Sequence, residues 1–95
     1  MTEFGDRLAV FRQRFLARAA EDAAAMKAEV DAEAWDDLRR RAHSLAGNAG
    51  LFGFPEITDE ARRLEEAIDE DEGDKAIVTL ARQLIATLEA LPPPA

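Results

Sequence analysis

The sequence predicts an all-α protein that folds as an antiparallel up-down four-helix bundle. Ala, Leu, Glu and Arg, which favour helices, dominate the chain, while three of the five glycines fall within residues 47–53 and three of the four prolines within 92–94. Apolar residues recur at intervals of three and four in four segments. Because the connections between these segments are short, we expect neighbouring helices to run antiparallel.

The first predicted helix begins near Thr2, which can cap it, and the second is entered near Asp31 and ends before Gly53 and Pro55. The first apolar stripe, which skips a step among residues 23–25, consists of Leu8, Phe11, Phe15, Ala19, Met26 and Val30. The second consists of Trp35, Leu38, Ala42, Leu45, Ala49 and Phe52. Its position on this stripe places Trp35 in the predicted core.

The last two predicted helices are separated by the acidic stretch of residues 69–74, which Gly73 interrupts. The third stripe consists of Ile57, Ala61, Leu64 and Ile68. The fourth consists of Ile77, Leu80, Leu84, Leu88 and Leu91. Because the three prolines that follow cannot continue a helix, we predict one domain over residues 1–91 and a proline-rich tail over residues 92–95.

Composition excludes several classes of function. A chain of 95 residues holds one modest core and no deep enzyme cleft. Its net charge of −8 disfavours nucleic acid and anionic membranes as partners. The absence of cysteine excludes disulfides and thiolate chemistry and suits a reducing cytoplasm, where we expect the protein to reside. With a single histidine, no signal-peptide pattern and no apolar run of membrane-spanning length, we also expect no metal site and no membrane anchor.

His43 is the only histidine and lies at the outer edge of the second stripe. Helical side chains lean toward the N-terminus, so the residue four positions later, Gly47, overlies the imidazole, and Ala46 beside it is nearly as small. Glycine inside a helix costs about 1 kcal/mol relative to alanine. A lone surface histidine is usually an ordinary polar residue, and glycines usually mark helix ends. Their combination with Gly50 and adjacent arginines favours a functional site instead.

In the run AHSLAGNAGLFGF at residues 42–54, followed by Leu64 and Glu65, the chain resembles histidine-containing phosphotransfer (HPt) domains, most closely those of chemotaxis histidine kinases. The resemblance implies a bundle whose exposed His43 accepts a phosphoryl group from a kinase or a receiver aspartate. His43 would then pass this group to a response-regulator receiver domain of a bacterial two-component phosphorelay. The family usually has lysine three residues after the histidine, where this chain has Ala46, so the neutralisation of the phosphoryl charge is in question.

The chemistry of imidazole fits this reading. A neutral imidazole can attack phosphorus through one nitrogen while an acceptor holds the other. No nucleotide-binding motif such as GxxxxGK[ST] is present, so we expect a phosphohistidine carrier without kinase activity of its own, and leave open whether it counts as an enzyme. We predict that the chain needs no cofactor, with Mg²⁺ only on the partner receiver.

Counting from a turn near Phe54 identifies two further candidate site residues, because residues equidistant from the turn of an antiparallel hairpin lie opposite each other. His43 is 11 residues before Phe54 and Glu65 is 11 after it, so Glu65 could hold one imidazole nitrogen, and the family resemblance points to the same glutamate. Ala46 and Arg62 are likewise 8 residues on either side, so Arg62 could replace the missing lysine. Each could instead be an ordinary surface residue.

We predict a partner-binding surface around His43, formed by Arg39, Arg40, Ala46, Gly47 and Gly50. In the alternative reading, the arginines of residues 39–41 pair with Asp36 and Asp37 of their own helix. Likewise, Arg62 could pair with Glu66. We expect a monomer, because no exposed face looks continuously apolar. Two other functions stay open: a non-catalytic helical adaptor, and an HPt-like protein that binds receivers or kinases without phosphotransfer.

Overall fold

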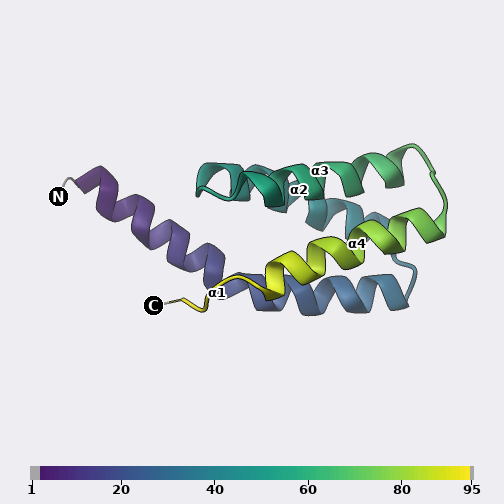
Figure 1. The fold of residues 1–95 in the computed structure, drawn as a ribbon, viewed down its shortest axis with the longest axis horizontal. Helices are drawn as coiled ribbons and strands as arrows, with labels where there is room; N and C mark the ends of the chain where they lie inside the picture. Colours follow the sequence, from purple (N-terminus) through teal and green to yellow (C-terminus); the bar gives the residue numbers. More distant parts are fainter. Residues whose placement is uncertain (1–2, 95) are drawn as a thin grey trace.

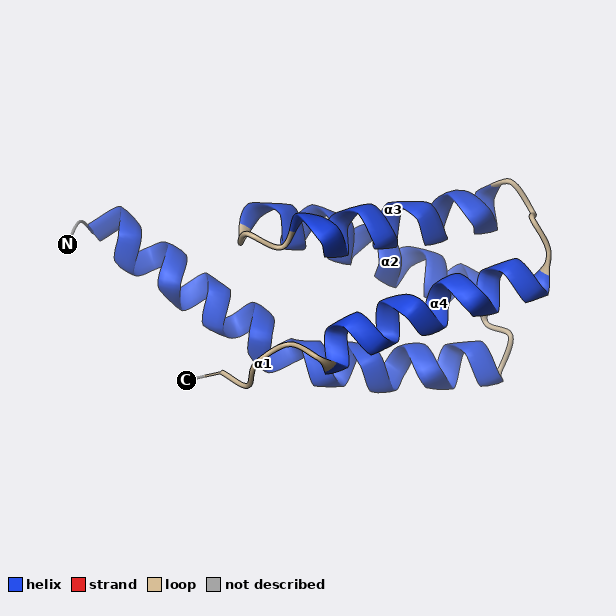
Figure 2. Cartoon of the chain, viewed as in Figure 1, coloured by secondary structure: helices blue, strands red, loops and turns tan. Residues whose placement is uncertain are grey.

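The computed structural model describes the backbone of residues 3–94 and the side chains of residues 7–94. Over this range the chain consists of helices and short connections, with no strand (Figure 2). The helices are α1 (Glu3–Asp31), α2 (Trp35–Leu51), α3 (Pro55–Asp69) and α4 (Asp74–Glu89). Each helix contacts the two neighbours that precede and follow it around the bundle, and the α2–α3 hairpin lies across α1 and α4 (Figure 1). The predicted all-α antiparallel four-helix bundle is confirmed.

The connection between α1 and α2 lies later in the chain than the sequence indicates. The prediction that the second helix is entered near Asp31 is wrong, because α1 continues to Asp31 and α2 begins at Trp35. Glu33 adopts a left-handed conformation with φ 53°, which reverses the chain between the two helices. Trp35 is partly buried and packs against the core, as its stripe position indicates. The predicted cap at Thr2 lies outside the described residues.

The other two connections each contain one glycine that the backbone requires. Gly53 follows α2 with φ 87°, and Pro55 then opens α3 in the first turn, where its missing N–H is of no consequence. Gly73 has φ 103° and precedes α4. The α3–α4 connection covers residues 70–73, so the predicted acidic stretch of residues 69–74 also includes the last residue of α3 and the first of α4.

The core is formed by the apolar stripes of all four helices. Its largest fully buried side chains are Met26, Leu38, Ile57, Leu64, Leu84 and Leu88. Ala23, which falls in the gap of the first stripe, is only 1% exposed, so a small side chain completes this stripe rather than interrupting it. Small buried residues let the helices pack closely, as a core of this size requires.

The first half of α1 extends past the other helices (Figure 1). The α1 helix has 29 residues and α4 has 16. Because a helix rises 1.5 Å per residue, α1 is much longer than α4, and its first residues extend beyond the helix on which they could pack. Leu8 and Phe11, although they lie on the first apolar stripe, are therefore not part of the core: they are 40% and 43% exposed. Val10 and Leu51 are also exposed, so the chain does carry apolar surface at this end.

Aromatic side chains attach the α2–α3 turn to α1. Phe15 stacks on Phe54 with ring centroids 5.1 Å apart, and Phe11 stacks on Phe52 at 6.0 Å. The guanidinium carbon of Arg12 lies 4.9 Å from the centroid of the Phe54 ring. These contacts hold the turn that determines the register of the α2–α3 hairpin.

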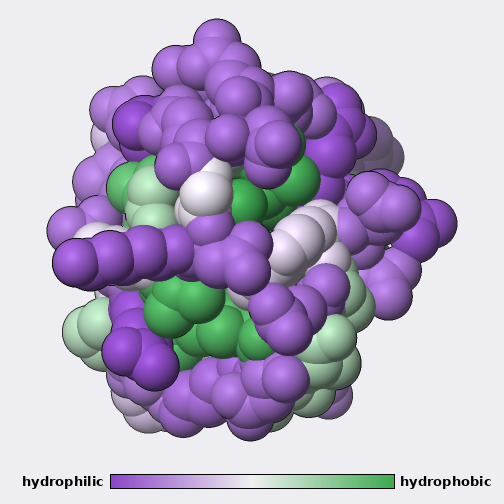
Figure 3. All heavy atoms as spheres, turned by 90° about the vertical axis from the view of Figure 1, so that its right-hand side faces the viewer, coloured by the Kyte–Doolittle hydropathy of each residue, from purple (hydrophilic) through white to green (hydrophobic). Residues whose placement is uncertain are grey.

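The opposite end of the bundle carries the α1–α2 and α3–α4 connections. Hydrophilic atoms cover most of it and surround a smaller hydrophobic area (Figure 3). Among the described residues, no helix is both long enough and apolar enough to cross a membrane. Residues 92–94 are exposed and non-helical, and the division into a domain of residues 1–91 and a tail stays a prediction.

Candidate functional site

His43 projects from the middle of α2 between two core positions. Its side chain is 73% exposed, whereas neighbouring Ala42 is fully buried and Leu45 is 4% exposed. Its Nδ1 atom lies 2.9 Å from Oε2 of Glu65, a residue of α3 whose side chain is only 16% exposed. The structure therefore places Glu65 opposite His43, where hairpin counting expects it. A partly buried carboxylate on one helix holds an exposed ring on the other.

This contact determines which imidazole nitrogen is available. A carboxylate can only accept a hydrogen bond, so Nδ1 of His43 carries the proton and donates it to Glu65. In the neutral ring, Nε2 then has a free lone pair. Among residues 7–94, whose side chains are described, the Glu65 carboxylate is the one hydrogen-bonding partner of this ring. The arrangement presents a nucleophilic nitrogen on an exposed side chain.

The small residues around His43 have distinct surroundings. A Cβ atom added at Gly47 would meet no other atom within 4 Å, so the space over the imidazole is open. Ala46 is only 6% exposed, and its carbonyl accepts a hydrogen bond of 2.9 Å from Oγ1 of Thr58. A Cβ atom at Gly50 would lie 3.2 Å from the same hydroxyl oxygen. Of these predicted partner-binding residues, Gly47 lies in open space and Ala46 is buried beside Thr58 of α3. The lack of a side chain at Gly50 leaves room for the Thr58 hydroxyl.

Arg39 lies one turn before His43 on α2 and reaches the same glutamate. Its Nη2 is 3.3 Å from Oε2 of Glu65, the oxygen that also accepts from His43. Its Nε donates to Asp69, one turn after Glu65 on α3, and Nη2 lies 3.3 Å from the second oxygen of Asp69. The hydrogen bond from Arg39 lowers the pKa of the Asp69 carboxyl, and the same bond raises the pKa of Arg39.

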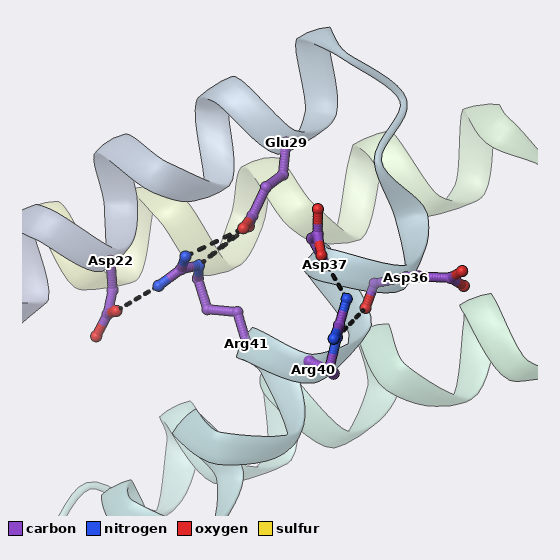
Figure 4. Close-up of polar contacts among 6 residues, drawn as sticks. All are labelled: Asp22, Glu29, Asp36, Asp37, Arg40 and Arg41. Atoms are coloured by element: carbon purple, nitrogen blue, oxygen red, sulfur yellow. Dashed lines mark hydrogen bonds and ion pairs between the residues drawn. The ribbon is translucent and has the colours of Figure 1, made fainter.

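Arg41 faces away from His43 and joins α2 to α1. Its Nη1 donates to Asp22 at 2.9 Å and its Nε donates to Glu29 at 3.0 Å (Figure 4). Both acids belong to α1 and are mostly buried in this contact. Arg41 is thus a connector between helices.

Arg40 pairs within its own helix. Its Nη2 donates to the Asp37 side chain, and its Nε lies 3.4 Å from the carbonyl oxygen of Asp36 (Figure 4). All three arginines of residues 39–41 therefore contact carboxylates of this chain, as the alternative reading of the basic run expects. Their partners differ from those expected in two cases, since only Arg40 uses Asp36 and Asp37.

Arg62 is exposed on α3, three residues before Glu65. The alternative, an ion pair between Arg62 and Glu66, does not form among the described residues. Glu66 instead lies 3.7 Å from Arg63. Among the described residues Arg62 has no ion pair or hydrogen bond from its side chain. Its guanidinium therefore has no partner among the described residues, and its role at the phosphoryl group stays a prediction.

The main groove of the described structure lies away from His43. A groove of about 520 Å³ lies between α1 and α2, and its lining includes Arg14, Arg18 and Ser44 but not His43. At the α3–α4 connection, oxygens of the exposed acids Glu66, Glu70 and Glu72 lie within 4.8 Å of one another. Arg63 already pairs with the first and the last of these acids. The exposed imidazole remains the chemically distinctive group of the described chain.

The fold and the site together define a small four-helix bundle domain with one exposed histidine that a glutamate of the adjacent helix holds. The Hpt domain family matches residues 10–92, which is most of the 95-residue chain. The chain therefore belongs to the Hpt domain family. No curated protein and no solved structure matches it significantly.

Arg39 contacts the glutamate that holds His43, which the sequence did not predict. The sequence places Arg39 on the predicted partner-binding surface, but a side chain that leans toward the N-terminus, away from His43, makes it a weaker candidate than Arg62 for neutralising the phosphoryl charge. The counting rule that pairs His43 with Glu65 also pairs Arg39 with Asp69, since each lies 15 residues from Phe54. That signal was present in the sequence, and the contact between Arg39 and Asp69 follows the same register.

Proposed function

We propose that this chain is the histidine phosphotransfer protein of a two-component phosphorelay. His43 accepts a phosphoryl group from a histidine kinase or a receiver aspartate and passes it to a response-regulator receiver domain. The observation that carries the proposal is the 2.9 Å contact from Nδ1 of His43 to Glu65 on an otherwise exposed ring. Membership of the Hpt family supports the same chemistry.

The transfer step follows from the tautomer. Nε2 of His43 attacks the phosphorus of an aspartyl phosphate, a P–N bond forms, and the P–O bond to the donor aspartate breaks, which releases its carboxylate. The attacking nitrogen carries no hydrogen, so no base has to remove a proton. The ring gains positive charge as the bond forms, and the Glu65 carboxylate, which accepts the Nδ1 proton, stabilises that charge. Reversal of the same step delivers the group to the next receiver.

The phosphoryl charge has two sources of compensation in this proposal. Arg62 contributes a guanidinium from α3, where the usual lysine position of α2 is Ala46. Guanidinium binds phosphate oxygens through two parallel donors, so it suits this role. The partner receiver supplies Mg²⁺, and this chain needs no cofactor of its own. In phosphoryl transfer a protein contributes mainly positioning and stabilisation of charge.

The open surface around His43 suits a docking partner that brings its own active site. Gly47 leaves space beside the ring, and Arg39 and Arg40 flank it on α2. A receiver domain and a sensor histidine kinase are the proposed partners, in a cytoplasmic bacterial pathway. An acidic receiver site would meet these arginines, which steers the encounter more than it strengthens binding.

The test is incubation of the full chain with receiver domains carrying labelled aspartyl phosphate. We expect acid-labile label on the wild type and none on His43→Gln. Glu65→Ala should take up label more slowly, because its imidazole is no longer held in one tautomer. Binding of receivers without label exchange would favour an HPt-like protein that does not transfer, which Ala46 in place of lysine makes the second candidate. Neither binding nor label would favour a helical adaptor.

A further inference from the structure

We propose that Arg39 is a positioning residue for His43, which acts by fixing the carboxylate of Glu65. This inference deepens the proposed function, since it concerns the same histidine. Arg39 does not contact the imidazole itself in the structure, so any effect on the ring passes through the glutamate.

The two contacts meet on one oxygen atom. Oε2 of Glu65 lies 2.9 Å from Nδ1 of His43 and 3.3 Å from Nη2 of Arg39. A glutamate side chain has several rotatable bonds, and a single hydrogen bond leaves much of that freedom in place. The ion pair with Arg39 adds a second contact from the preceding turn of α2, and together the two contacts restrict the carboxylate to one position. The Glu65 carboxylate, which Arg39 holds in place, then orients the imidazole of His43.

Asp69 holds Arg39 in place for this contact. The guanidinium lies between two acids of α3 that are four residues apart, with Nε on Asp69 and Nη2 within 3.3 Å of both Asp69 and Glu65. A planar guanidinium can serve two such carboxylates at once, whereas an ammonium group would act as a point charge. The result is a chain of contacts that runs from Asp69 through Arg39 and Glu65 to His43.

Exposed ion pairs usually contribute little to stability. A test of Arg39 therefore has to distinguish its contact with Glu65 from the general effect of removing an exposed, paired arginine. The protein contains a matched case. Arg63 of α3 is exposed to a similar extent as Arg39 and also pairs with two acids, Glu66 and Glu72. It does not contact Glu65 or His43 in the described structure. Arg63→Ala therefore removes the same charge and the same kind of pairing away from the site.

The experiment compares the unphosphorylated full chain with Arg39→Ala and Arg63→Ala by ¹⁵N NMR of the His43 imidazole at about pH 8.5, where an ordinary imidazole is neutral. The wild type and Arg63→Ala should show the Nδ1–H tautomer as the dominant form. Arg39→Ala should shift toward a mixture of both tautomers, and Arg39→Lys should lie between it and the wild type. Circular dichroism checks that each variant remains folded.

A wild-type tautomer ratio in folded Arg39→Ala would overturn the proposal, and so would an equal shift in Arg63→Ala. In a parallel transfer assay, Arg39→Ala should accept phosphate roughly tenfold more slowly than Arg63→Ala, as expected for a loss of orientation. A wild-type rate in Arg39→Ala would also overturn it. If the wild type itself accepts no phosphate, the proposed function fails, while the tautomer measurement still decides the positioning role.

Discussion

Gly47 and Gly50 lie on the same side of α2 but have different surroundings. A Cβ atom at Gly47 would meet nothing within 4 Å, whereas one at Gly50 would lie 3.2 Å from Oγ1 of Thr58. Thr58 is buried and donates to the carbonyl of Ala46, so it has little freedom to move away. Gly50 is therefore explained by helix packing. Gly47 has no packing reason, which points to access at His43.

Gly47→Gln should separate stability from function. We expect its free energy of unfolding to rise by up to about 1 kcal/mol, because glycine is unfavourable inside a helix and the site has room for a side chain. Phosphate uptake on His43 should nevertheless slow markedly, because the new side chain covers the ring. Urea denaturation and a transfer assay measure the two effects. An unchanged transfer rate in the folded variant would show that the open space does not serve access.

Arg62→Ala tests the source of positive charge at the phosphoryl group. We expect slower transfer or less stable phosphohistidine, with little change in folding stability, because Arg62 is exposed and forms no ion pair within the described residues. Adding Ala46→Lys should recover part of the loss, although Ala46 is buried beside Thr58 and the new stem has to reach outward. Wild-type kinetics in Arg62→Ala would mean that the receiver alone supplies the charge.

Residue-level reasoning from the sequence reached the pair His43 and Glu65 because an antiparallel hairpin has a simple register. It misjudged Arg39, since a rule for side-chain direction along one helix ignores acids on the neighbouring helix. In the structure the Arg39 side chain contacts Glu65 and Asp69 on α3.

At the scale of the elements, helix types and most boundaries followed from periodicity, but two features did not. The start of α2 was placed too early, because Ala32 and Ala34 favour helix and do not mark the turn at Glu33. The exposure of Leu8 was also missed, since periodicity shows which face of a helix is apolar and not whether another element covers that face. The second question depends on the relative lengths of α1 and α4.

The two phenylalanines of α1 should differ strongly in their contribution to stability. Phe15 is 8% exposed and stacks on Phe54, so Phe15→Ala should destabilise the bundle by about 3–5 kcal/mol. Phe11 is 43% exposed, so Phe11→Ala should cost about 1–2 kcal/mol. Denaturant titration followed by helical circular dichroism measures both. Similar losses for the two variants would show that the first half of α1 is covered in solution.

The α3–α4 connection should make stability depend on pH. Arg63 donates to both oxygens of Glu72, at 2.9 and 2.7 Å, and this lowers the pKa of the Glu72 carboxyl. A lowered pKa in the folded state means that the contribution is present above the ordinary glutamate value and is lost as the pH falls through the folded value. The wild type should therefore lose more stability than Glu72→Gln as the pH falls from about 6 to about 3.

Urea denaturation at a series of pH values measures this difference. A matched control is Glu21→Gln, an exposed acid of α1 for which the described residues show no ion pair. Its acid-range loss of stability should run parallel to that of the wild type. Parallel curves for Glu72→Gln as well would contradict the assigned role of the Arg63–Glu72 contact.

At the scale of the whole molecule, the net charge and the fold could be predicted from the sequence. The ion-pair partners of the arginines at residues 39–41 could not. The chain carries a net charge of −8, so each arginine has many possible partners. The bundle assigns Arg39 to α3, Arg40 to α2 itself and Arg41 to α1. Adjacent residues on a helix point in different directions, and so three neighbours in the sequence serve three separate contacts.

Apolar surface at one end of the molecule bears on its oligomeric state. The expectation of a monomer assumed that no exposed face was apolar, yet Leu8, Val10, Phe11 and Leu51 are all exposed near the start of α1 and the end of α2. The arginines among residues 7–18 make this region basic, so two copies would bring like charges together. The monomeric state stays a prediction.

The central claim is that Glu65 occupies Nδ1 of His43 and leaves Nε2 to take the phosphoryl group. The most direct measurement is NMR of the ¹⁵N-labelled, phosphorylated chain, which identifies the nitrogen bonded to phosphorus from its coupling to ³¹P. The account predicts a single phosphohistidine at Nε2 of His43 in the wild type. Phosphate on Nδ1, or on a residue other than His43, would contradict it.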